Sequence, residues 1–167
     1  MLEAMPRAVL LAAVILGLCA GGALAQSPAP SPIAGVWRFQ SEVDTRADGS
    51  VVQISPADGW DGYAVYTSDG FVSINIMPKG RKWKLKTATL KELKRTLEDG
   101  SAYFGRYKVD PAAGTVTHLV RTSVEPEFEN KNLVRRYSID GDTLTLSGST
   151  ASNGEAITFT IRWTRER

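Results

Sequence analysis

The chain offers few side chains for covalent or acid–base chemistry. Its 167 residues include one histidine, His118, and one cysteine, Cys19. A Ser-His-Asp arrangement would therefore have a single possible base, and a zinc site built from several histidines is impossible within one chain. The glycines lie at expected turns and form neither a dinucleotide-binding nor a phosphate-binding loop. We accordingly expect no metal and no cofactor.

Several polar residues share a strand face with apolar ones. His118 alternates in phase with Val116 and Val120, and Arg135 alternates in phase with Leu133 and Ile139. If such faces line an interior, their polar members would converge on one pocket, as a ligand site requires. The candidate ligand-binding residues are Arg135, Tyr137, His118, Tyr103, Tyr107 and Tyr66.

Arg135 is the most informative of these residues. A guanidinium that faces an interior keeps its charge and needs a carboxylate, water or an anionic ligand as partner. Arg135 and Tyr137 are thus a candidate pair for binding a ligand carboxylate. Two other interpretations stay open: Arg135 could point outward, or it could form an internal ion pair with Glu42, Glu125 or Glu127.

His118 has a structural and a catalytic interpretation. A histidine on an apolar strand face is usually a hydrogen-bonded core residue. As a catalytic residue, His118 could act as a general acid or base near neutral pH, with Tyr107 or Tyr103 as a proton donor to a bound carbonyl. This is the only acid–base set that the sequence offers.

The residues that would position these groups form short alternating strands. Ser101 to Leu146 predicts four consecutive antiparallel strands, with turns at Asp110–Gly114 and Asp140–Asp142. The whole chain gives nine strand-like runs joined mostly by short hairpins, which favours an all-β, antiparallel up-and-down barrel of about eight to ten strands over a two-sheet sandwich. In the last run, Arg165 follows an apolar face, and we expect its guanidinium to stack on Trp37 at one barrel end.

One short helix is predicted over about residues 88–99. Thr89 and Glu92 form a capping-box pattern, and Leu90, Leu93 and Leu97 follow at helical spacing. We expect this leucine stripe to lie on apolar surface, so that the helix covers one end of the barrel. The basic residues between Lys79 and Lys94 are interpreted as a solvated face.

The N-terminal residues predict export. Arg7 precedes an apolar run that ends in the small residues of a cleavage site, so residues 1–25 are interpreted as a signal peptide. Residues 26–32 form a Pro-rich linker, and residues 33–167 form the domain. A lipoprotein signal at Cys19 is disfavoured, because Leu18 occupies a position where a small side chain is needed. We expect a periplasmic or secreted protein without stable membrane insertion after cleavage, and a net charge of only +2 gives no reason to propose nucleic acid as a partner.

Five stretches of the chain together resemble a known family. They are Gly35–Arg38, Gly62–Gly70, Tyr103–Asp110, Gly114–His118 and Val134–Leu146. The chain is similar to the lipocalin-like domain family of bacteria and fungi, within the calycin superfamily. The resemblance implies a small barrel with a central pocket. It does not imply one activity, because some fungal relatives are associated with secondary-metabolite pathways.

The sequence therefore favours a non-catalytic binding protein for a small hydrophobic or carboxylate-bearing molecule. Aromatic contacts would hold the apolar part of that molecule, and Arg135 would orient its polar end. An isomerase or cyclase that uses His118 and a tyrosine such as Tyr107 is the first alternative. A filled structural barrel without a ligand is the second.

Overall fold

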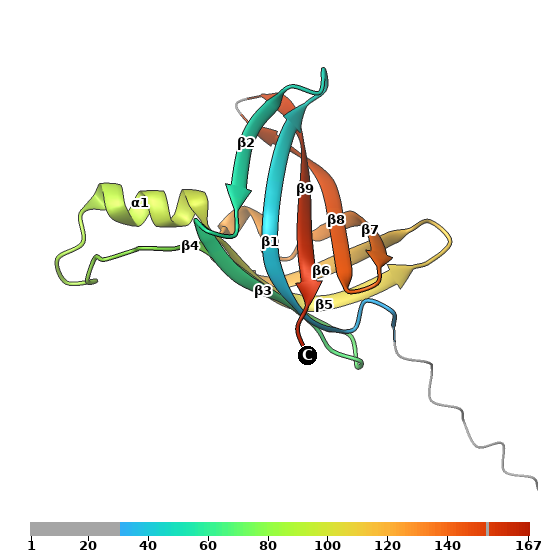
Figure 1. Ribbon diagram of the computed structural model, residues 1–167. Coiled ribbons are helices and arrows are strands. Elements are labelled where there is room, and N and C mark those ends of the chain that lie inside the picture. The colour runs from blue at the N-terminus through green and yellow to red at the C-terminus, as the bar shows by residue number, and fades with distance from the viewer. Residues whose placement is uncertain (1–30, 153) are drawn as a thin grey trace, which may run out of the picture.

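The computed structural model describes residues 31–152 and 154–167, and the predicted signal peptide and most of the predicted linker lie outside the described residues. The described part contains nine strands and two short helices (Figure 1). The strands are β1 (Gly35–Arg46), β2 (Val51–Pro56), β3 (Trp60–Tyr66), β4 (Phe71–Pro78), β5 (Ser101–Asp110), β6 (Thr115–Ser123), β7 (Asn132–Asp140), β8 (Thr143–Ser152) and β9 (Glu155–Arg165). The helices are α1 (Leu90–Asp99) and a 3-10 turn, Pro126–Phe128.

The strands close into an antiparallel barrel, as the sequence predicts. They follow the order β2-β1-β3-β4-β5-β6-β7-β8-β9, and β1 also pairs with β9. Two strands share one edge of β1, because β3 pairs with Gly35–Arg38 and β2 pairs with Ser41–Thr45. The nine strands therefore occupy eight positions around the barrel.

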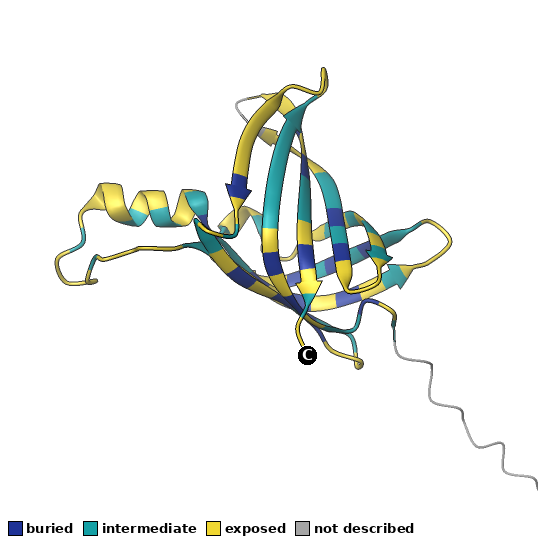
Figure 2. Ribbon diagram, viewed as in Figure 1, coloured by how far each residue is buried: buried dark blue, intermediate teal, exposed yellow. Residues whose placement is uncertain are grey.

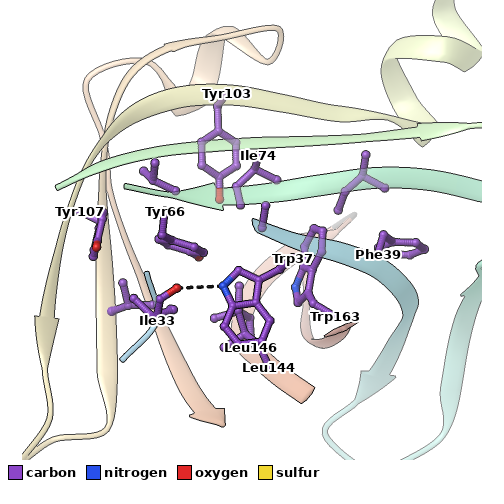
Figure 3. Packing of buried hydrophobic residues seen from close by; sticks show 14 of the residues in the cluster. Ile33, Trp37, Phe39, Tyr66, Ile74, Tyr103, Tyr107, Leu144, Leu146 and Trp163 are labelled. Carbon is purple, nitrogen blue, oxygen red and sulfur yellow. Dashed lines mark hydrogen bonds between the residues drawn. The ribbon is translucent and has the colours of Figure 1, made fainter. Parts of the chain in front are cut away.

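One end of the barrel, here the closed end, is filled by aromatic side chains. The buried parts of β1, β8 and β9 gather toward this end (Figure 2). Trp37 and Trp163 are fully buried there, beside Leu144 and Leu146 (Figure 3). The Trp37 indole N–H donates to the carbonyl oxygen of Ile33 at 2.8 Å. This bond satisfies a buried donor that would otherwise destabilise the fold.

An arginine completes the closed end. The guanidinium of Arg165 lies 4.0 Å from the centroid of the Trp37 ring and donates to the carbonyl oxygens of Ala34, at 3.0 Å, and Pro32, at 3.4 Å. A Cβ at Gly35 would lie 2.6 Å from Arg165 Nη1. The φ of +141° is the main reason for glycine at this position, and a side chain there would also displace the Arg165 guanidinium.

Helix α1 lies at the opposite end, here the open end, and only its last turn is attached there. Its N-terminus has the predicted capping box between Thr89 and Glu92. At its C-terminus, the Trp60 indole donates to the carbonyl oxygen of Asp99 at 3.2 Å. No helix in the described part of the chain is long and apolar enough to cross a membrane.

The expectation that the leucine stripe of α1 lies on apolar surface is wrong. Leu90 is 81% exposed and Leu97 is 54% exposed, and no residue of the helix is buried. The prediction assumed that the helix would cover one end of the barrel with its leucines facing inward. Instead it projects to the side (Figure 1), and its inner side meets Trp83, whose indole donates to Thr96 Oγ1 at 3.1 Å.

Candidate functional site

A cavity of about 440 Å³ lies inside the barrel and reaches the open end. This volume falls within the range of small-molecule sites. Its apolar wall is built from inward-facing residues of several strands, among them Ile74, Ile76, Leu133, Leu146, Phe159 and Ile161. A second hollow, of about 420 Å³, lies near the Pro78–Arg81 segment, and none of the predicted site residues lines it.

The charged residues that line the cavity are mostly acidic. Of the arginines that the structure describes, Arg135 alone lines it. The carboxyl side chains come from β1, from α1 and from the segment after β6, and they are Glu42, Asp44, Glu98, Asp99, Glu125 and Glu127. Glu98 and Asp99 pair with Lys94 and Arg95 on α1, so that Glu42, Asp44, Glu125 and Glu127 are the acidic groups left around the permanent positive charge of Arg135.

A β-bulge in β1 turns two of these carboxyl groups inward. Phe39 pairs with Trp163, but Ser41 pairs with Arg162, so one residue of β1 is left over between them. The bulge shifts the alternation of β1 by one residue. Beyond it, Glu42 and Asp44 occupy inward positions opposite Ile161 and Phe159.

The burial of these carboxyl groups changes their protonation. Burial raises the pKa of Glu42 to about 7, with a further upward contribution from Asp44, while Arg135 acts in the opposite direction. Burial also raises the pKa of Asp44 and of Glu125. One oxygen of Asp44, Oδ1, is buried without a hydrogen-bond partner among the described residues.

Arg135 extends from β7 into the cavity. Its guanidinium carbon lies 4.6 Å from the centroid of the Phe159 ring. Among the described residues, no carboxylate lies within 4.0 Å of its nitrogens. Gly148 makes room for this stack, because a Cβ there would lie 2.6 Å from Phe159 Cζ and 3.2 Å from Arg135 Cδ.

His118 is fully buried between two tyrosine hydroxyl groups. Its Nε2 is 2.9 Å from Tyr66 Oη, and its Nδ1 is 2.7 Å from Tyr103 Oη. Burial lowers the pKa of His118 to about 3, and the positive charge of Arg135 adds to the effect. The imidazole is therefore neutral at physiological pH, with one donor nitrogen and one acceptor nitrogen.

The structure brings together half of the predicted ligand-binding residues. Arg135, His118 and Tyr103 line the cavity, and Tyr66 contacts this group through His118. Tyr107 and Tyr137 are not among the lining residues. The Tyr107 hydroxyl donates to the carbonyl oxygen of Thr67 at 2.8 Å, and Tyr137 packs against the core in a half-buried position.

Sequence reasoning did not identify Asp44 or Phe159 as cavity residues. The alternation of inward and outward residues in β9 could have identified Phe159, because it shares its face with Ile157 and Trp163. Asp44 could not be found in this way, because the bulge that turns it inward has no clear sequence signal. In the described part of the chain, no group of three or more His, Cys, Asp or Glu residues could hold a metal ion.

Comparison with known proteins gives one family match. The sequence model of a family described as "Lipocalin-like domain" matches residues 34–166. No curated protein matches the chain. The matched range includes all nine strands and the cavity that they enclose.

Proposed function

The chain belongs to the lipocalin-like domain family, and on this premise we propose that it binds a small apolar or amphipathic molecule inside the barrel without transforming it chemically. The fold supports this proposal, because a barrel of about eight strands can hold one small ligand. We also propose that binding occurs after export, in the periplasm or outside the cell. The signal-peptide pattern of residues 1–25 supports that location.

The observation that carries the proposal is the cavity around Arg135. An interior space of about 440 Å³ supports a guest molecule over a filled barrel. The guanidinium of Arg135 faces this space, stacks on Phe159 and has no carboxylate within 4.0 Å among the described residues. A permanent charge in this setting would gain from a ligand oxygen that accepts its hydrogen bonds.

The surroundings of His118 support binding over catalysis. An isomerase or cyclase mechanism would need the imidazole to exchange a proton with the ligand. Both ring nitrogens already bond tyrosine hydroxyls, and the lowered pKa of about 3 makes the imidazole a weak base at neutral pH. Tyr107 would be a poor proton donor to the cavity, because its hydroxyl bonds the Thr67 carbonyl.

Two measurements test the proposal. Native mass spectrometry of protein purified from its own host should reveal a retained small molecule. In vitro, the fluorescent apolar probe N-phenyl-1-naphthylamine should bind saturably, and amphipathic molecules of similar size should displace it. If no molecule is retained and the probe does not bind saturably, the proposed function is wrong.

A matched pair of variants tests the role of Arg135. Arg135→Leu should weaken the binding of 2-undecanone or undecanoate by about tenfold, the equivalent of one charge-assisted hydrogen bond, and leave the affinity for N-phenyl-1-naphthylamine unchanged. Arg136→Leu is the control, because Arg136 is the next residue of β7 and is exposed. Equal effects of the two variants would show that Arg135 does not anchor the ligand.

A further inference from the structure

We propose that the polar end of the ligand is an uncharged acceptor oxygen, such as that of a ketone, aldehyde or ester, bound by the Tyr103 hydroxyl next to Arg135. This inference rests on the proposed function and adds the chemical class of the bound group. It follows from the number of hydrogens available between Tyr66, His118 and Tyr103, and from the charges that surround them.

In the two hydrogen bonds between His118 and the hydroxyl groups of Tyr66 and Tyr103, only one tyrosine hydroxyl donates its hydrogen. A neutral imidazole has one N–H donor and one bare acceptor nitrogen. The tyrosine at the bare nitrogen donates its own hydrogen, and the tyrosine at the N–H only accepts. In either tautomer, one of the two hydroxyl hydrogens is therefore left for another acceptor.

Burial decides which tyrosine keeps this hydrogen. Tyr66 is almost fully buried, does not line the cavity, and has only one hydrogen-bond partner among the described residues, His118 Nε2. If Tyr66 only accepted a hydrogen bond, its own hydrogen would be buried without a partner, at a cost of about 1–3 kcal/mol. Tyr66 therefore donates to Nε2, and the imidazole proton lies on Nδ1.

Tyr103 consequently has a hydrogen to donate. Its oxygen accepts from His118 Nδ1 at 2.7 Å, and no acceptor among the described residues takes its own hydrogen. Tyr103 lines the cavity together with Arg135. Burial raises the pKa of the Tyr103 hydroxyl, so it keeps its hydrogen, while the positive charge of Arg135 acts in the opposite direction. An oxygen placed between the two side chains would receive hydrogen bonds from both.

The charges around this position favour an uncharged oxygen. Glu42 and Asp44 face the cavity from β1, and Glu125 and Glu127 face it from the segment after β6. Glu98 and Asp99, at the end of α1, are ion-paired with Lys94 and Arg95 and contribute less. A ligand carboxylate would add to this negative charge. A protonated ligand amine would suit the carboxyl groups, but an ammonium group has no lone pair and could not accept a hydrogen bond from Tyr103 or Arg135. A carbonyl oxygen suits both donors and adds no net charge.

Competition among three ligands of equal chain length tests the inference. The unmodified protein is loaded with N-phenyl-1-naphthylamine and titrated with 2-undecanone, undecanoate or undecylamine at pH 8. We expect 2-undecanone to displace the probe at the lowest concentration. Equal or stronger displacement by undecanoate or undecylamine would overturn the inference and leave the proposed function intact. If the probe itself does not bind, it is the proposed function that fails.

A tyrosine pair and the histidine tautomer give independent readouts. Tyr103→Phe should weaken the binding of 2-undecanone by about threefold to tenfold. Tyr107→Phe, which removes a hydroxyl that bonds Thr67 away from the cavity, should leave the affinity unchanged. Because Tyr103→Phe could impair folding, nitrogen-15 NMR of His118 in the unmodified protein provides a second test. A proton on Nδ1 supports the inference, and a proton on Nε2 overturns it.

Discussion

Two arginines lie against aromatic rings inside this barrel, one at the closed end and one in the cavity, and their surroundings differ. Arg165 stacks on Trp37 and donates to two backbone carbonyl oxygens. Arg135 stacks on Phe159 at a similar distance and has no carboxylate within 4.0 Å among the described residues. The same side chain can therefore complete the fold or face a ligand, depending on whether the backbone supplies acceptors.

The origin of the difference is the path of the chain. The closed end is where β1 begins and β9 ends, so the turn before β1 lies there, and the hydrogen bond from Ala34 N to the carbonyl oxygen of Ser31 closes this turn. Its carbonyl groups point at Arg165. At the open end the strands end in hairpins, the 3-10 turn and the attachment of α1, and the cavity remains between them.

The largest expected effect is the loss of the closed-end core. Trp37→Ala should lower the free energy of unfolding by about 3–5 kcal/mol, because it removes a fully buried aromatic ring and leaves a cavity. Chemical denaturation with urea measures this change. Trp60→Ala at the open end is the control and should cost less, because Trp60 is only partly buried. Equal losses would show that the two ends contribute alike to stability.

The two arginines should separate stability from binding. Arg165→Leu should lower the free energy of unfolding by about 2 kcal/mol, because it removes a cation–π contact and leaves two backbone carbonyl oxygens without their charged donor. Arg135→Leu should lower the free energy of unfolding by only about 0.5–1 kcal/mol, because it removes a cation–π contact but leaves no backbone carbonyl oxygen without its donor, and it should act mainly on ligand affinity. Urea denaturation and probe displacement on both variants check this. A stability loss for Arg135→Leu as large as that for Arg165→Leu would show that both arginines stabilise the fold alike.

The sequence predicts the closed end better than the cavity. Strand alternation and turn residues such as Asp140–Asp142 specify local structure, so the closed antiparallel barrel and the inward phase of Trp37 and Arg165 follow from them. Alternation tells which face a residue occupies, but not how far along the barrel axis it lies. For this reason Tyr107 and Tyr137 share a phase with cavity residues and yet do not line the cavity.

Two features of the site depend on tertiary structure that no local pattern encodes. The bulge between Phe39 and Ser41 reverses the expected phase of the second half of β1 and brings Asp44 into the cavity. The exposed leucines of α1 are the second feature that the local sequence pattern does not predict. A helical period identifies an apolar stripe, but it does not specify the surface on which the stripe packs.

The smallest expected effect is a pH dependence that belongs to the cavity alone. The folded-state pKa of Glu42 is raised to about 7 from an ordinary value of 4.5, so the folded protein binds more protons than the unfolded chain between these values. Stability from this group is then fully present below about pH 4.5 and is lost as pH rises toward 7. In Glu42→Gln the free energy of unfolding should fall by about 1 kcal/mol less over this pH range, a figure that allows for screening by solvent near the group.

Urea denaturation at pH 5 and pH 7.5 measures the Glu42 contribution. Asp44 and Glu125, whose pKa values burial also raises, act with the same sign, so part of the decline should remain in Glu42→Gln. Arg165→Leu should keep the full decline, because the group it removes at the closed end does not titrate in this range. If Glu42→Gln left the decline intact while Arg165→Leu abolished it, the protonation of the cavity would not control the pH dependence. The closed end would then be the source of the coupling between pH and stability.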